Sequence, residues 1–412
     1  MNDTTDSLEV LQRAVNYDEG KVPVYTLPDP LRLEDGQKVS SPEMWWGKRR
    51  PEILGVFEEL VYGRTPAGTV PVRAEILRVN PEALGGKATS TEVRLCFSDQ
   101  DDPNMVLMII LPNNQPEPVP LFLGLNFFGN QSVIADPGIL LSEQWMRDKP
   151  EMGVTGNRAT EASRGKEAER WQVELIIGRG YGLATAYYGD LDPDFDDGFQ
   201  NGVQPLFYEQ DQQRPAGNEW GSIGAWAWGL SRAYDYLASL PGVDAQAVAV
   251  MGHSRLGKAA LWAGAQDQRF KMVISNNSGC GGAAISRRKV GETFTFINKA
   301  FPHWFCENFH EYSGREEDLP VDQHELIALV APRAVYIASA SEDLWADPKG
   351  ELLAGEKAEP VYALLGYPGL AKAGEPESSR EARIGYHIRE GGHDVTRFDW
   401  EHYLDFADKH LR

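Results

Sequence analysis

The sequence predicts an α/β fold, a three-layer αβα sandwich around a mixed, mostly parallel sheet. From about residue 170 onward, short apolar segments alternate with amphipathic helical ones. This alternation is typical of a parallel sheet covered by helices on both faces. Between residues 70 and 127, strand-like segments instead follow one another directly. We expect these earlier strands to form an antiparallel edge of the same sheet.

The strands expected in the second half are short and apolar. They read GLATAYY, AVAVM, KMVIS, AVYIAS and GYHIRE. Helical segments such as WGSIGAWAWGLSRAYDYLASL lie between them, and the chain closes with the helical TRFDWEHYLDFADKHL. The earlier strands read VPVRAEILRV, STEVRLCFS, MVLMIILP and VPLFLGLNF. No repeat or clear linker interrupts the chain, so we expect residues 1–412 to form a single domain, with residues 1–65 as a helical extension packed on it.

The composition narrows the class of partner. The 412 residues include 40 Lys and Arg and 61 Asp and Glu, so the formal net charge is −21. Such an acidic surface repels polyanions, which argues against nucleic acid and gives no support for anionic membranes as partners. No run of about 18 apolar residues exists, so we expect no membrane span. The N-terminus lacks the basic start and apolar core of a signal peptide.

The potential metal ligands do not form a recognisable site. Three cysteines, Cys96, Cys280 and Cys306, occur without C-x-x-C spacing, so neither a zinc site nor a dithiol motif is indicated, and at most one disulfide is possible within the chain. We expect no metal and no cofactor.

One acidic stretch has part of a calcium-loop pattern. Asp192, Asp194 and Asp196 have the right spacing, but such a loop also needs glycine at its sixth position and glutamate at its twelfth. The chain has Asp197 and Val203 there. We expect this stretch to shape the loop after a strand instead.

The most informative segment is AVAVMGHSRLGKAALWAG, residues 247–264, a strand, a tight turn and a helix. Gly252, Gly257 and Lys258 fit a phosphate-binding loop, G-x-x-x-x-G-K-[ST]. That loop needs a hydroxyl for Mg²⁺ after the lysine, and the chain has Ala259 there. A nucleotide site is therefore disfavoured.

The same turn fits a nucleophile elbow, G-x-S-x-G, except at its last position. Gly252 and Ser254 match, Leu256 stands where the second glycine is expected, and Gly257 follows one residue later. An elbow places its serine hydroxyl at a helix N-terminus, where the helix dipole favours developing negative charge. The alternative is an ordinary strand-to-helix turn with a capping serine.

The order of possible partners favours the elbow. A hydrolase elbow expects an acid after a later strand and a histidine after the last one. The strand AVYIASAS ends in Glu342 and Asp343, and GYHIRE ends in a Gly-Gly loop that carries His393. We therefore expect Ser254 as nucleophile, His393 as base and Asp343 as the acid that orients the imidazole, with Glu342 as the alternative acid.

The negative charge that develops on the substrate carbonyl oxygen needs hydrogen-bond donors to stabilise it. The backbone N–H of Arg255 is one candidate, and its side chain can add a positive charge. We expect the second donor in the loop after LFLGLNFFGN. His253, next to the serine, is expected to point away from the site.

Ser254-Arg255-x-Gly257-Lys258 resembles the signature of carbohydrate esterase family 15, the glucuronoyl esterases. Further segments resemble bacterial members: GLATAYYGDLDPDFDDGF, EWGSIGAWAWGLSRAYDYL, SNNSGCGGAAISRRKVGET, FPHWF, LPVDQHELIALVAPR and EDLWADPKGE. The resemblance implies an α/β-hydrolase catalytic domain without a metal. It implies cleavage of esters between 4-O-methyl-glucuronate on glucuronoxylan and lignin alcohols. It also implies a secreted or periplasmic location, and we expect a monomer.

By the same resemblance, Arg255 matches the oxyanion arginine, and Lys258, Glu292 and Trp345 match residues that hold the glucuronate ring. A lysine and a carboxylate can bind sugar hydroxyls, and a tryptophan can cover a sugar face. One position departs from the pattern. Asn277 stands in SNNSG where many members carry a glutamate as triad acid, which strengthens Asp343 as the acid.

Two other functions remain open. An acetyl xylan esterase or general carboxylesterase would share the triad but would not need Lys258, Glu292 and Trp345. An inactive carbohydrate-binding homologue would keep the fold without turnover, and the intact order of serine, acid and histidine argues against it.

Overall fold

The computed structural model describes residues 2–66, 70, 72–370 and 381–412. Its main sheet has nine strands within these ranges, in the spatial order β1-β2-β3-β7-β4-β8-β9-β10-β11. Their bounds are β1 (Arg73–Glu82), β2 (Ala88–Cys96), β3 (Asn104–Pro112), β4 (Val119–Asn126), β7 (Gly182–Tyr187), β8 (Val243–His253), β9 (Met272–Asn276), β10 (Ala334–Ala340) and β11 (Ile384–Arg389). A separate two-stranded sheet pairs β5 (Val154–Thr155) with β6 (Arg158–Ala159).

The sheet is mixed and mostly parallel. Strands β1, β2, β3 and β7 pair antiparallel in that order, and every other neighbouring pair is parallel. The predicted fold class is therefore confirmed.

One expected strand lies elsewhere in the sheet. The sequence pattern places VPLFLGLNF at the antiparallel edge, but as β4 it pairs parallel with both β7 and β8. Its side chains are buried on both faces almost throughout, which is typical of a central parallel strand. The antiparallel edge thus consists of β1, β2 and β3.

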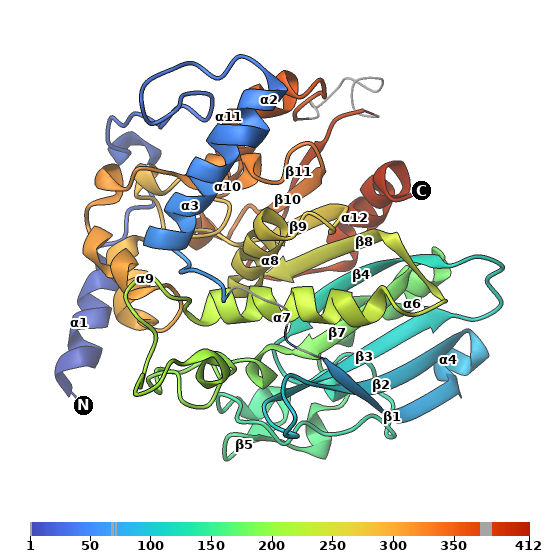
Figure 1. Ribbon diagram of the computed structural model, residues 1–412. Helices are drawn as coiled ribbons and strands as arrows, with labels where there is room; N and C mark the ends of the chain where they lie inside the picture. Colours follow the sequence, from blue (N-terminus) through green and yellow to red (C-terminus); the bar gives the residue numbers. More distant parts are fainter. Residues whose placement is uncertain (1, 67–69, 71, 371–380) are drawn as a thin grey trace.

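Helices cover both faces of the sheet (Figure 1). On one face lie α3 (Arg50–Leu60), α7 (Ser222–Leu237), α8 (Arg255–Gln266), α10 (Gln323–Ala328) and α11 (Pro348–Leu364). On the other lie α5 (Ala168–Trp171), α6 (Val173–Gly178) and α12 (Arg397–His410). Each face of the sheet has its own hydrophobic core, and successive side chains of β4 point to opposite faces. Leu121 and Leu123 pack in the core on the first face, and Phe122 packs in the core on the second.

The remaining α-helices in the described residues are α1 (Asn2–Arg13), α2 (Pro42–Met44), α4 (Ala83–Gly86) and α9 (Phe294–Ala300). The N-terminal segment contacts the sandwich through buried arginines: Arg49 Nη2 donates to Glu325 Oε1 at 2.8 Å, and Arg50 Nη2 donates to the carbonyl of Ala265 at 2.6 Å. Single-domain organisation stays a prediction.

Two further properties of the fold bear on the expectations from the sequence. Within the described ranges, no helix is both long and apolar enough to cross a membrane. The three cysteines are buried and carry no disulfide.

Candidate active site

Ser254 lies in the turn between β8 and α8, with φ 58° and ψ −130°. A non-glycine residue in this conformation stores strain, as the serine of a nucleophile elbow does. The turn is closed so tightly that a Cβ at Gly252 would lie 1.9 Å from the carbonyl oxygen of Leu256. Glycine is therefore required at position 252.

The displaced second glycine also has a structural reason. A Cβ at Gly257 would lie 3.0 Å from the Cβ of Ser278 and 3.1 Å from the carbonyl oxygen of Gly252, so the crowded position is 257. Leu256 points instead into the core, where it is buried. The one-residue departure from the motif keeps the close approach that the elbow needs.

His393 lies beside the predicted acid. Its Nδ1 donates to Asp343 Oδ2 at 2.6 Å, and Asn277 Nδ2 donates to the same oxygen at 2.7 Å. Burial alone would raise the pKa of Asp343, but the hydrogen bonds from His393 and Asn277 lower it below its usual value. The carboxylate therefore stays ionised. Glu342 is exposed, and its backbone N–H donates to the carbonyl of Gly391 at 3.0 Å.

His253 does not point away from the site. Its ring lies 4.5 Å from the ring of His393, and its Nδ1 is 2.7 Å from Asn276 Oδ1. Because Asn276 donates its amide to the Tyr403 hydroxyl at 2.8 Å, its oxygen accepts from His253, whose Nδ1 carries the proton. Burial and the nearby His393 hold the pKa of His253 well below its usual value, so this ring is neutral.

Arg255 is fixed by a buried carboxylate to which the sequence pattern assigns only a role in loop shape. Its guanidinium forms an ion pair with Asp194 and lies 4.6 Å from the ring centre of Trp304. Asp194 also accepts from the Tyr188 hydroxyl at 2.9 Å, from Trp304 Nε1 at 2.8 Å and from His303 Nε2 at 3.0 Å. These contacts together fix the guanidinium of Arg255, the residue after Ser254.

This carboxylate remains charged. Burial would raise the pKa of Asp194, but Arg255 and His303 hold it far below its usual range. Asp192 faces a different partner, the Ser222 hydroxyl, so the two aspartates do not form one ligand set. Sequence reasoning missed Asp194 as a site residue; the available signal was a carboxylate in the loop that follows β7.

The three predicted sugar-binding residues line the same cavity as Ser254 and His393. Lys258 Nζ donates to the carbonyl of Cys280 at 2.5 Å and to Glu292 Oε2 at 3.2 Å. Trp345 packs its ring 4.7 Å from that of Phe296. The cavity has a volume of about 330 Å³ and is lined by Ser254, Arg255, Lys258, Asn277, Ser278, Gly279, Glu292, Phe296, Phe301, Trp304, Asp343, Trp345, Ala346 and His393.

Known proteins share this arrangement of the chain. The sequence profile of the family described as "Glucuronyl esterase, fungi" matches residues 204–366. A carbohydrate esterase from an unknown prokaryotic organism is 51% identical over 405 residues, which cover 97% of this chain and 93% of the relative. The solved glucuronoyl esterase from Solibacter usitatus has a TM-score of 0.88 at 49% identity, over 95% of this chain and 100% of the other. The chain belongs to carbohydrate esterase family 15, the glucuronoyl esterases.

A more distant relative belongs to the fungi. The 4-O-methyl-glucuronoyl methylesterase of Schizophyllum commune is 25% identical, over 83% of this chain and 74% of the fungal protein. Like these relatives, the chain is a carboxylic ester hydrolase.

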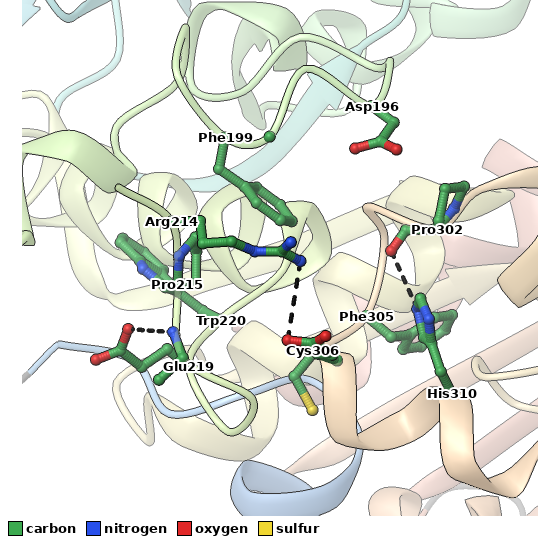
Figure 2. A pocket seen from close by; sticks show the side chains of 13 residues that line it. Asp196, Phe199, Arg214, Pro215, Glu219, Trp220, Pro302, Phe305, Cys306 and His310 are labelled. Atoms are coloured by element: carbon green, nitrogen blue, oxygen red, sulfur yellow. Dashed lines mark hydrogen bonds and ion pairs between the residues drawn. The ribbon is translucent and has the colours of Figure 1, made fainter. Parts of the chain in front are cut away.

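The esterase also has a smaller cavity of about 160 Å³, which is shown in Figure 2. The segment 301–306 contributes to both cavities: Phe301 and Trp304 line the cavity of Ser254, whereas Pro302 and Phe305 line the smaller one. Figure 2 shows Phe199 and Arg214 on the opposite wall. Neither the elbow nor the triad candidates line this smaller cavity.

Proposed function

We propose that this esterase hydrolyses esters of 4-O-methyl-glucuronic acid on glucuronoxylan, as in lignin–carbohydrate linkages, through a Ser-His-Asp triad and an acyl-enzyme. The observation that carries the proposal is the position of the Lys258–Glu292 pair and Trp345 in one cavity with Ser254 and His393. The fungal relative's name supports the same substrate class.

The triad supplies the nucleophile. Because Asp343 engages Nδ1 of His393, Nε2 is the nitrogen that takes the proton from Ser254 Oγ. The oxygen then attacks the ester carbonyl, and the protonated imidazole returns the proton to the departing alcohol. Water, activated by the same Nε2, hydrolyses the acyl-enzyme and frees the serine.

Arg255 stabilises the oxyanion. Its backbone N–H lies at the first position of α8, where the helix dipole favours negative charge. Its guanidinium adds N–H donors, which the ion pair with Asp194 holds in place before the reaction begins. A donor fixed in advance does not have to reorganise as charge develops.

Lys258 and Glu292 bind the uronate ring. Both side chains are buried, so their ion pair is shielded from water and presents donors and acceptors in a defined geometry. Trp345 offers an aromatic face to the ring. A simple acetyl group would use none of these contacts.

The decisive experiment compares kcat/KM on benzyl glucuronate and on p-nitrophenyl acetate, with Ser254→Ala as the inactive control. We expect a clear preference for the glucuronate ester, and Lys258→Ala should reduce it far more than the acetate reaction. Similar rates on both substrates would favour a general carboxylesterase or acetyl xylan esterase.

An inactive carbohydrate-binding homologue is separated by one further test. A serine-reactive fluorophosphonate should label the wild-type protein and not Ser254→Ala. Absence of labelling in both would favour the binding protein. Secretion or periplasmic location, the extent of xylan recognition and the monomeric state stay predictions.

A further inference from the structure

The segment after α1 lies against the two loops that carry the sugar-binding candidates. Helix α1 packs beside α9 (Figure 1), and the chain then passes the loop that ends in Glu292. Here the N–H of Gly291 donates to the carbonyl of Asn16 at 2.9 Å, and the N–H of Glu292 donates to the carbonyl of Trp345 at 3.0 Å. Three segments far apart in the sequence are thus joined by two consecutive backbone hydrogen bonds.

The contact between the two loops is close. Gly291 has φ 65°, and a Cβ there would lie 2.2 Å from the carbonyl oxygen of Trp345. Small displacements of either loop therefore move the other. Tyr17, nearly half exposed at 47%, continues the N-terminal segment towards the triad acid, Asp343, whose charge adds to the effect of burial in raising the pKa of the tyrosine.

Glu19, on the protein surface, binds one cation from each of these two loops. One carboxylate oxygen accepts from Arg288 Nη2, and the other accepts from Lys349 Nζ at 2.6 Å. Arg288 precedes Glu292 by four positions, and Lys349 lies in the first turn of α11, just after Trp345. The two cations thus belong to the two loops.

The Arg288 side of these ion pairs is buried. Arg288 Nε donates to Asp347 Oδ2 at 2.7 Å, and Asp347 Oδ1 accepts from the backbone N–H of Gly350 at 3.0 Å, which caps α11. Only 3% of the Arg288 side chain is exposed. The guanidinium therefore connects Glu19 to a fixed helix terminus.

We propose that Glu19 is a positioning residue that clamps the loops carrying Glu292 and Trp345 and thereby sets the affinity for the uronate ring. This inference rests on the proposed function. Glu19 does not line the catalytic cavity, so it acts through the loops and takes no part in the chemistry at Ser254.

The charge of Glu19 is secured by its partners. Burial raises its pKa, but the hydrogen bonds and positive charges of Lys349 and Arg288 together lower it below the usual value, so the carboxylate is ionised at neutral pH. Half of the Glu19 side chain and 57% of the Lys349 side chain are exposed. Salt screens exposed pairs, so the ion pair of Glu19 with Lys349 weakens at high ionic strength.

The test is steady-state kinetics of Glu19→Gln on benzyl glucuronate and on p-nitrophenyl acetate, with Glu34→Gln, an exposed carboxylate of the same N-terminal region, as the matched control. We expect KM for the glucuronate ester to rise about three- to tenfold at nearly constant kcat, because the altered pairs are partly exposed charge-assisted bonds. Acetate kinetics and the Glu34→Gln enzyme should stay unchanged.

Two further measurements exclude a general loss of structure. High salt should raise the glucuronate KM of the wild type and leave that of Glu19→Gln nearly constant. Lys349→Ala, which removes only the exposed partner, should raise KM in the same direction by a smaller factor.

The outcomes separate the two proposals. A wild-type enzyme that does not hydrolyse the glucuronate ester overturns both. An active wild type with an unchanged KM in Glu19→Gln, or with equal losses on both substrates, overturns the role of Glu19 alone.

Discussion

Asn277 donates a hydrogen bond to Asp343, and it does so to Oδ2, the oxygen that also accepts from His393. Asn277 follows β9 and Asp343 follows β10, so the two loops meet beside one imidazole. The resemblance described from the sequence implies a glutamate at the Asn277 position in many members of the family. The geometry therefore offers two places from which a carboxylate can orient the same histidine.

The first prediction concerns Asp343. Asp343→Asn should reduce kcat by about 10⁴-fold, since an amide neither fixes the productive tautomer nor stabilises the imidazolium. The matched variant Glu342→Gln should stay near wild type, because that side chain is exposed. The reverse result in steady-state assays would move the acid role to Glu342.

A second prediction concerns moving the carboxylate that orients His393 from position 343 to position 277. Adding Asn277→Glu to Asp343→Asn should recover at least tenfold of the lost kcat, because residue 277 lies within hydrogen-bond distance of residue 343 beside the imidazole. The single variant Asn277→Glu should instead be impaired, since two adjacent carboxylates disfavour each other's ionisation. No recovery in the double variant would show that only the loop after β10 can orient His393.

A third prediction concerns backbone strain at the elbow. Ser254→Ala should abolish turnover and leave the fold intact. Ser254→Gly should also be inactive but more stable than Ser254→Ala by about 1–3 kcal/mol, because glycine adopts φ 58°, ψ −130° without the penalty of a Cβ. Urea unfolding of the two variants measures this difference, and equal stabilities would argue against a strained turn.

A fourth prediction tests Asp194, the ion-pair partner of Arg255, whose oxyanion role is proposed above. Asp194→Asn should reduce kcat by roughly 10²- to 10³-fold, which is the usual cost of losing one oxyanion donor. Asp196→Asn is the control, because Asp196 lines the smaller cavity. A raised KM with normal kcat would instead assign Asp194 to substrate binding.

The same carboxylate predicts a pH dependence of stability. The pKa of Asp194 in the folded protein lies below the value near 3.9 of an unfolded chain. Its contribution is therefore fully present above about pH 5 and is lost only as the pH falls through the lower folded value. Urea unfolding at several pH values should show a constant stability difference between wild type and Asp194→Asn down to about pH 5 and a shrinking one below it. A difference that shrinks between pH 8 and pH 6 would contradict this assignment.

The parts of the site that sequence reasoning reached are those with a local signature. Ser254 lies in a turn whose glycines are required by close contacts, and Asp343 and His393 each follow a strand end. The fold class followed from alternation alone, but the position of β4 did not, because a continuous apolar run fits either an edge pair or a buried parallel strand.

The remaining contacts depend on residues distant in the chain. Asp194 and Arg255 are 61 positions apart, and Glu19 and Lys349 are 330 apart. No local pattern links such residues. The packing of His253 on His393 was missed for another reason: the turn sets where the backbone goes, whereas the ring direction depends on Asn276 of the neighbouring strand.

The pairing of cations with buried carboxylates also bears on the affinity of the site for its product. Arg255 and Lys258 are each neutralised by a permanent partner, Asp194 and Glu292. In the proposed reaction the ester enters such a cavity uncharged and the uronic acid product is an anion. Two cations that are already paired retain this anion only weakly. We therefore expect weak product inhibition, so that accumulating acid does not slow the enzyme during extended digestion.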